Sequence, residues 1–156
     1  MRILVISATN RQPHWVRDGF DDYARRLDAR CCLDLVEVPL AKRTRASDTG
    51  KAVEDESGRM LRRIPAGARV VALAADGQGW STERLAGKLQ AWLAGGAPIC
   101  LLIGGPDGLG SECLARAAER WSLSPLTLPH GLVRVIVAEA VYRAWSLLNG
   151  HPYHRG

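Results

Sequence analysis

Short β-branched apolar runs alternate along this sequence with segments whose apolar residues recur at helical spacing. That alternation predicts an α/β fold: a mostly parallel sheet flanked by helices. The run Pro98–Ile103 is almost entirely apolar, which is typical of a central strand buried on both faces. The predicted strands are Arg2–Ser7, Leu33–Val38, Arg69–Ala74, Pro98–Ile103 and a last one that starts at Trp121 and is broken at Pro125.

Helical patterns fill the connections between these runs. After Pro13, the side chains of Val16, Phe20 and Leu27 share one helical face, and charged residues occupy the other. The segment Asp76–Gly79 is expected to be a loop. A second helix is expected to be N-capped by Ser47 or Asp48 and to end at Pro65 and Gly67. A third is expected to be capped by Ser81 and to end at Gly95–Gly96. The last two are expected to run from a cap at Ser111 to about Glu119, and from about Leu132 to Leu148.

The length of 156 residues suits one domain, so we expect a single unit over residues 1–156. Hydrophobic residues make up 47% and charged residues 24%, which excludes intrinsic disorder. No secretory signal and no apolar run of about 20 residues are visible, so a cytoplasmic protein without a membrane span is expected. The cysteines lack zinc-site spacing, and His151 and His154 have no neighbouring carboxylate or cysteine, so no metal is expected.

The basic residues point to an acidic partner. Lys and Arg total 21 against 16 for Asp and Glu, giving a net charge of +5. Most of these cations are arginines, whose planar forks match phosphate groups, and Lys42, Arg43 and Arg45 form a basic stretch. The balance suits nucleic-acid binding, although an arginine-rich genome would produce the same excess.

Three loops at strand ends form the best candidate for a binding site. They are Leu73–Gly79, Gly104–Gly110 and Leu123–Thr127, and each follows an apolar run. The carboxyl ends of parallel strands share one sheet edge, where ligands of such folds bind. Glycine permits close backbone approach and small hydroxyls supply hydrogen bonds, which suits a flat heteroaromatic ring such as adenine. Neither a phosphate-binding glycine motif nor a hydrolase G-x-S-x-G elbow is present.

The last predicted helix is apolar around most of its circumference. Such a helix must be buried on more than one side, so we expect a second subunit to cover part of it in a symmetric homodimer. Glu139 and Arg143 lie four residues apart on it, as a structural ion pair or as functional groups.

Two further segments leave alternatives open. The tail His151–Arg155 combines aromatic and cationic side chains that could grip an unstacked base, although a frayed terminus has the same composition. His130 follows Pro129 at a helix start, where it could cap the helix or contact a substrate.

Several of these segments together closely resemble the RlmH family, the SPOUT-class methyltransferases that act on a pseudouridine of bacterial ribosomal RNA. The resemblance covers nearly the whole chain and is most specific between Ile103 and Tyr153. The segments that carry it are Leu101–Leu109, Trp121–His130, Leu132–Glu139, Tyr142–Ala144 and His151–His154.

The resemblance implies a fold and a reaction. The fold would be an α/β sheet with a C-terminal trefoil knot, in a homodimer. The reaction would be methyl transfer from S-adenosyl-L-methionine to N3 of a pseudouridine in 23S rRNA of the assembled ribosome. Neither DNA nor a membrane would be a partner.

The resemblance also implies site residues. Those for the cofactor are Leu73, Gly104, Leu123, Ser124, Pro125, Leu126, Thr127 and Leu128. Those for the target base and RNA are Arg134, Glu139, Arg143, Tyr153 and His154, with the tail reaching toward the partner subunit's cofactor.

The chemistry at N3 needs a group that removes a proton or stabilises an anionic ring. His154 could act as the base, or Arg143 or Arg134 could supply stabilising charge. Two other classes remain open. A non-catalytic basic RNA- or ribosome-binding α/β module would not bind the cofactor, whereas a small-molecule methyltransferase would bind it and ignore ribosomes.

Overall fold

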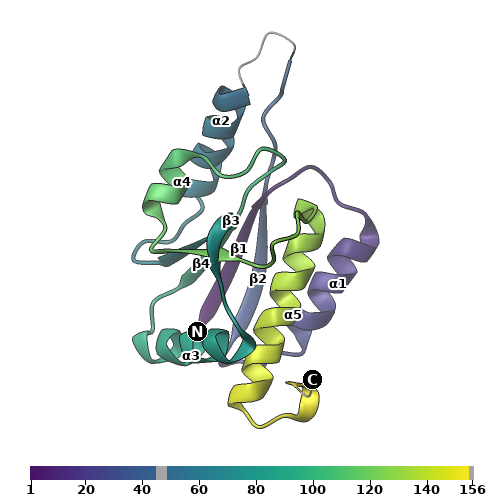
Figure 1. The fold of residues 1–156 in the computed structure, drawn as a ribbon, viewed down its shortest axis with the longest axis vertical. Coiled ribbons are helices and arrows are strands. Elements are labelled where there is room, and N and C mark those ends of the chain that lie inside the picture. The colour runs from purple at the N-terminus through teal and green to yellow at the C-terminus, as the bar shows by residue number, and fades with distance from the viewer. Residues whose placement is uncertain (45–48, 155–156) are drawn as a thin grey trace.

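The computed structural model describes residues 1–44 and 49–154 (Figure 1). The strands are β1 (Arg2–Ala8), β2 (Cys32–Val38), β3 (Arg69–Gly79), β4 (Ile99–Ile103) and β5 (Glu119–Ser122). The helices are α1 (His14–Arg25), α2 (Thr49–Leu61), α3 (Thr82–Gly95), α4 (Ser111–Arg116), α5 (His130–Leu148) and the 3-10 helix η1 (Pro152–His154). The predicted N-cap at Ser47 or Asp48, and Arg45 of the basic stretch, lie outside the described residues.

The strands form one five-stranded sheet in the order β2-β1-β4-β3-β5, and every pairing is parallel. The predicted α/β class is therefore confirmed. β4 lies at the centre and is buried at every position, as its apolar sequence predicts. Because β4, β3 and β5 are neighbours, the segments that follow them start close together at one sheet edge.

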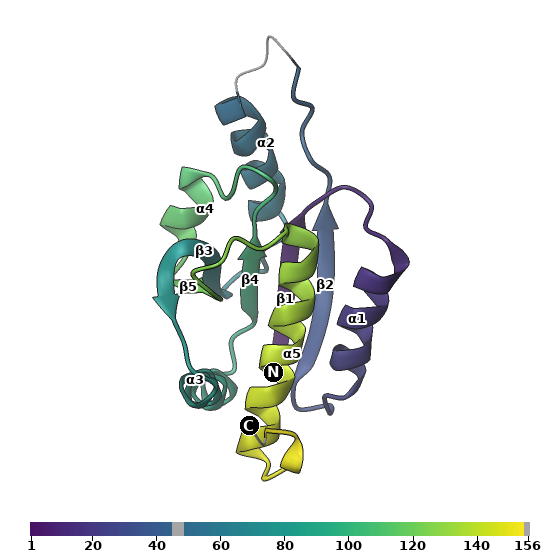
Figure 2. The ribbon, with the colours of Figure 1, turned by 45° about the vertical axis from the view of Figure 1, so that its right-hand side comes forward.

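Helices cover both faces of the sheet (Figure 2). Alternate side chains of β1 point to opposite sides: Ile3 and Val5 join the core beneath α1, α3 and α5, whereas Leu4 and Ile6 join the core beneath α2 and α4. This two-sided burial makes the strands read as continuous apolar runs rather than alternating ones. Helix α5 lies against α1 and α3 across the first face.

The third strand is longer than predicted. The segment Asp76–Gly79, expected to be a loop, belongs to β3, where Gln78 and Gly79 pair with Trp121 and Ser122 of β5. The register shifts between Leu73 and Gln78, so the intervening residues bulge out of the ladder. Gly77, one of the two glycines that predicted a loop, instead permits a close strand contact, since a Cβ there would lie 2.7 Å from the carbonyl carbon of Arg120 in β5.

The region after Gly110 also differs from prediction. Helix α4 ends at Arg116 rather than near Glu119, because Glu119 pairs with Val71 and opens β5. Gly110 occupies the N-cap position that was assigned to Ser111. Glu119 is held by ion pairs with Lys88 and Arg69, contacts between distant segments that local patterns do not contain.

Other boundaries agree with the sequence. Ser81 Oγ accepts a hydrogen bond from the Arg84 amide at 3.0 Å, and Gly96 ends α3 with φ of 75°. Within the described ranges, no helix combines the length and apolarity needed to cross a bilayer. Nor does that part of the chain bring three His, Cys, Asp or Glu side chains together around a possible metal position.

Candidate functional site

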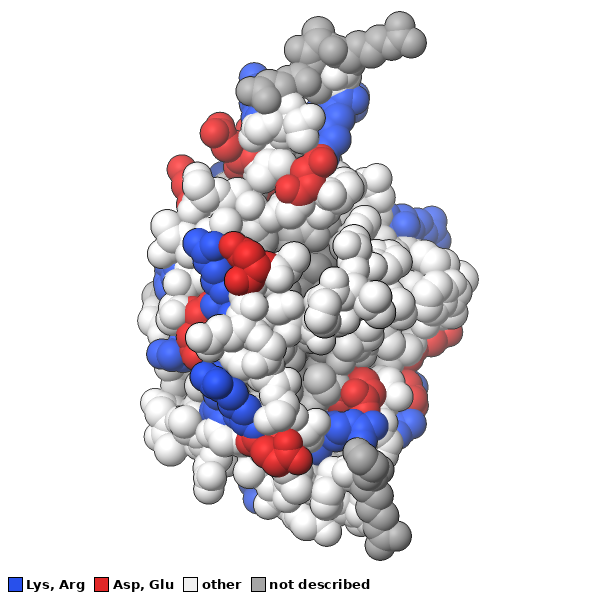
Figure 3. Space-filling model, in the orientation of Figure 1, with Lys and Arg blue, Asp and Glu red and all other residues white. Residues whose placement is uncertain are grey.

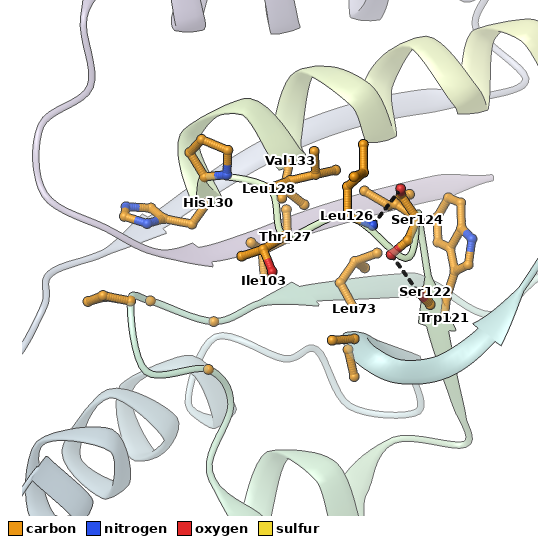
Figure 4. Close-up of a pocket in the computed structure, with 18 residues that line it drawn as sticks. Leu73, Ile103, Trp121, Ser122, Ser124, Leu126, Thr127, Leu128, His130 and Val133 are labelled. Carbon is orange, nitrogen blue, oxygen red and sulfur yellow. Dashed lines mark hydrogen bonds between the residues drawn. The ribbon is translucent and has the colours of Figure 1, made fainter.

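The three predicted loops converge on one cavity of about 520 Å³ at the carboxyl edge of the sheet (Figure 4). Its size lies within the usual range for small-molecule sites. The lining residues are Leu73, Ala74, Ala75, Ile103, Gly104, Gly105, Pro106, Gly108, Trp121, Ser122, Leu123, Ser124, Leu126, Thr127, Leu128, Pro129, His130 and Val133. All the cofactor residues implied by the sequence therefore line it except Pro125.

Backbone packing shapes the side of the cavity that follows β4. A Cβ atom at Gly104 would lie only 2.5 Å from the carbonyl carbon of Gly108, so no other residue fits there without displacing the turn. The Gly108 amide donates a hydrogen bond to the Gly105 carbonyl at 3.0 Å, and Gly108 has φ of 82°, which glycine adopts without strain. The loop thus brings main chain, rather than side chains, to the cavity.

The opposite side of the cavity comes from the segment after β5. Ser122 Oγ donates to the Ser124 carbonyl at 3.3 Å, and the Leu126 amide donates to Ser124 Oγ at 2.9 Å, so the two serines define the local turn. Trp121 stacks on Trp80 with ring centroids 4.8 Å apart and supports this end of the site. Leu126 is 73% exposed, an apolar side chain left at the rim.

The cavity is almost free of charge. Among the described residues that line it, His130 alone carries an ionisable side chain. Burial, together with the nearby positive charge of Arg134, lowers the pKa of His130, so its imidazole is neutral at physiological pH. Figure 3 agrees at larger scale, since charged side chains gather around the margin of this face and leave its centre uncharged.

His130 and its neighbours were not predicted as a group. The imidazole lies at the end of the cavity away from Trp121, and its Nε2 is 3.5 Å from Gln12 Nε2 (Figure 4). Gln12 also donates to Thr9 Oγ1 at 2.6 Å. The proline before His130 hinted at a helix start, but contacts across 118 residues of sequence leave no local signal.

Three of the five residues implied for the target base, Glu139, Arg143 and Tyr153, form a second cluster, remote from the cavity. Arg143 Nη2 lies 2.7 Å from Glu139 Oε1, and the Tyr153 hydroxyl donates to the same oxygen at 3.2 Å. The Arg143 guanidinium also lies over the Tyr153 ring, and that ring packs on Tyr142. Burial and the Glu139 charge are among the causes that raise the pKa of Tyr153, which keeps its hydroxyl protonated.

Helix α5 separates this cluster from the cavity. The helix begins at His130 beside the cavity and ends near the tail at the opposite end of the molecule (Figure 1). Its 19 residues span about 28 Å at 1.5 Å per residue. One protomer therefore does not bring Tyr153 or His154 to its own cavity. His154 is half-buried, and its Nδ1 has no hydrogen-bond partner within the described part of the chain.

Arg134 lies apart from both groups. Its side chain is fully buried and pairs with Glu37 at 3.1 Å. Its Nε and Nη2 atoms have no hydrogen-bond partner among residues 1–44 and 49–154. Of the basic stretch, Lys42 is exposed, whereas Arg43 is engaged by two carboxylates.

Comparison with known proteins identifies the family. The family model described as "Predicted SPOUT methyltransferase" matches residues 1–154. Ribosomal RNA large subunit methyltransferase H of Marinomonas sp. (strain MWYL1) is 49% identical over 155 residues, which are 99% of this chain and 100% of the relative. The protein of the same name from Alkalilimnicola ehrlichii is 52% identical over 155 residues, 99% of each chain. A solved structure, the putative methyltransferase Lpg2936 from Legionella pneumophila with bound SAM, matches more distantly: 10% identity, a TM-score of 0.48, and 92% of this chain against 66% of its own. By the family match and its full-length relatives, the chain belongs to the SPOUT methyltransferases and, among them, to the RlmH family.

Proposed function

We propose that the protein transfers a methyl group from S-adenosyl-L-methionine to N3 of a pseudouridine in 23S rRNA of the assembled ribosome. The observation that carries the proposal is the convergence of the three loops on one uncharged cavity. The relatives' name supports an RNA of the large ribosomal subunit as the substrate.

The residues of the cavity suit this cofactor. Leu73 and Leu128 offer apolar surface to an adenine ring, and the backbone around Gly104 offers hydrogen-bonding groups without a side chain in the way. Because burial keeps His130 neutral, no fixed positive charge among the described lining residues would repel a sulfonium. When bound, the cofactor supplies an electrophilic methyl group. The chain would bind it with Leu73, Gly104, Leu123, Ser124 and residues 126–128, which all line the cavity.

The second cluster supplies the groups that act on the base. Arg143 offers positive charge to an anionic uracil ring, and Glu139 holds the guanidinium in place. His154 is the candidate acceptor for the N3 proton, because its imidazole Nδ1 has no hydrogen-bond partner among the described residues. Tyr153 docks the tail on α5 through Glu139.

A homodimer would bring the cavity of one protomer close to the second cluster and tail of the other. The tail is far from the cavity of its own protomer, so a second protomer has to present it. Helix α5 also keeps half-buried apolar side chains that a partner could cover: Leu132, Val135, Ile136, Ala140 and Leu147. Exposed Lys42 is a candidate contact to RNA phosphates. The trefoil knot stays a prediction of the family resemblance, and the cytoplasmic location stays a prediction from the sequence.

The test is methylation of ribosomes that lack the modification, followed by mass analysis of the nucleosides. We expect N3-methylpseudouridine in the large-subunit RNA, and none with free nucleosides. Calorimetry with S-adenosyl-L-methionine separates the alternatives. Failure to bind the cofactor would leave a non-catalytic RNA-binding module, whereas binding without ribosome methylation would indicate a small-molecule methyltransferase.

A further inference from the structure

We propose that Arg43 is a positioning residue for the cofactor: it ties the turn Gly105–Gly108 of the cavity to helix α2. This inference rests on the proposed function, because it assigns the cavity to S-adenosyl-L-methionine. It changes the role expected from the sequence, where Arg43 belonged to a basic stretch for RNA.

Every nitrogen of the Arg43 guanidinium already donates a hydrogen bond within the chain. Its Nε donates to Asp107 Oδ2 at 2.7 Å, and Nη1 and Nη2 donate to Glu56 at 2.7 and 3.2 Å. Nη1 also donates to the Ala41 carbonyl at 3.1 Å. Charge-assisted bonds of this length are the strong class, and binding an RNA phosphate would require breaking some of them.

Glu56 gives this arrangement its rigidity. Its side chain is 2% exposed, and it also accepts a hydrogen bond from the Ala41 amide at 3.0 Å. A buried carboxylate needs a partner charge, and Arg43 is the cation paired with it in the described structure. Glu56 therefore fixes the position of the Arg43 guanidinium, which in turn holds Asp107.

Asp107 lies inside the turn that borders the cavity. It sits between Gly105 and Gly108, which both line the cavity, but its own side chain faces Arg43. The turn rests directly on the α2 side, since a Cβ at Gly105 would lie 3.3 Å from Glu56 Oε1 and 2.7 Å from Leu40 Cδ2. Moving Asp107 would move the backbone that Gly104 presents to the cofactor.

Helix α2 holds the far end of the same loop independently. Ser57 Oγ accepts a hydrogen bond from the Gly110 amide at 2.9 Å, and Ser57 is buried. The loop thus has two anchors on adjacent residues of α2, one through Arg43 and one through Ser57. Removing the Arg43 anchor should loosen the turn Gly105–Gly108, whereas the Ser57 anchor should keep the start of α4 in place.

The test compares Asp107→Asn with Arg43→Lys and Arg43→Gln. Asp107→Asn removes one ion pair and leaves the buried Arg43–Glu56 pair intact, so the protein still folds. Arg59→Gln is the matched control: Arg59 lies on α2 and donates to the Pro39 carbonyl rather than to a residue of the turn. The measurements are amide hydrogen exchange of the cofactor-free protein, calorimetry with S-adenosyl-L-methionine, and the separate KM and kcat of ribosome methylation.

We expect Asp107→Asn to speed exchange in residues 105–108 without changing residues 111–116. Cofactor affinity should fall about threefold to tenfold, because the asparagine oxygen can still accept from Arg43 Nε but lacks the charge that strengthens the bond. KM for the cofactor should rise similarly, with kcat within about twofold. Arg43→Lys should restore part of the affinity that Arg43→Gln loses, and Arg59→Gln should match the wild type.

Unchanged exchange and cofactor affinity in Asp107→Asn would overturn the inference. So would an Arg43→Gln variant that loses ribosome binding while it keeps normal cofactor affinity, because that result assigns Arg43 to the RNA. A wild-type protein that binds no cofactor would instead overturn the proposed function, and the exchange of the turn would still decide whether Arg43 holds it.

Discussion

At the scale of single residues, the cavity depends on small groups in tightly defined surroundings. His130 is held neutral by burial and by the positive charge of Arg134, although Glu56 opposes the shift. Its lowered pKa has a consequence for stability. The unfolded chain takes up a proton near pH 6.5, whereas the folded chain resists protonation until a lower pH, so the folded state loses stability as pH falls through that window.

Replacing His130 should therefore flatten the acid side of the stability profile. We expect the melting temperature of His130→Gln to fall less than that of the wild type between about pH 7 and pH 5. His14→Gln, at an exposed histidine of α1, is the control and should follow the wild-type curve. Parallel curves for His130→Gln and the wild type in differential scanning calorimetry would contradict the assignment.

A substitution at Gly104 tests whether the close packing of this residue against the Gly108 backbone shapes the cavity. Gly104→Ala would place a methyl group against Gly108, so we expect at least about tenfold weaker cofactor binding and about 1–3 kcal/mol lower stability. Gly87→Ala is a suitable control, because nothing lies within 4 Å of its Cβ position in α3 and alanine favours a helix. Calorimetry and chemical unfolding measure both effects, and a Gly104→Ala variant with wild-type affinity would show that the turn adjusts freely.

At the scale of elements, the sequence predicted the features that depend on local patterns and missed those that depend on long-range contacts. The central strands could be predicted because burial on both faces makes their sequences continuously apolar. The helix caps at Ser81 and Gly96 could be predicted because each acts within one turn of its helix. The extension of β3 could not be read, because pairing with β5 gives Gln78 and Gly79 their conformation. The same holds for the anchors on α2, since nothing near Glu56 or Ser57 in sequence reveals the loop that each one holds.

The tail element lends itself to a direct test of its catalytic role. We expect His154→Ala to lower turnover on ribosomes by about 10²-fold or more, the usual contribution of a general base. Cofactor affinity should stay within about twofold of the wild type, because His154 is proposed to act on the base and is not among the residues that line the cavity. Tyr153→Phe is a milder comparison that keeps the ring on Tyr142 and removes the bond to Glu139. Normal turnover in His154→Ala would exclude it as the base.

At the scale of the whole molecule, the cavity and the tail lie at opposite ends of α5. The strand-end argument predicted that the three segments share one sheet edge, because parallel strands bring their following loops together, and seven of the eight cofactor residues implied by the family resemblance line the cavity there. Local patterns could not supply the separation of the cavity from the tail, because it follows from the direction of α5 in the folded chain. Nor can local patterns reveal how a chain threads through itself, so the knot came only from resemblance.

If the active site is shared between protomers, two defective subunits should restore each other. A Gly104→Ala subunit retains an intact tail, and a His154→Ala subunit retains an intact cavity. Co-expressed with different affinity tags and purified as the mixed dimer, the pair forms one site with both halves intact and one with neither. At a cofactor concentration that leaves the Gly104→Ala cavity largely empty, we therefore expect about half of the wild-type turnover per dimer, although each variant alone is strongly impaired there. Methylation that stays at the level of the separate variants would mean that each protomer completes its own site, and the tail would then have to swing along α5 to reach the cavity.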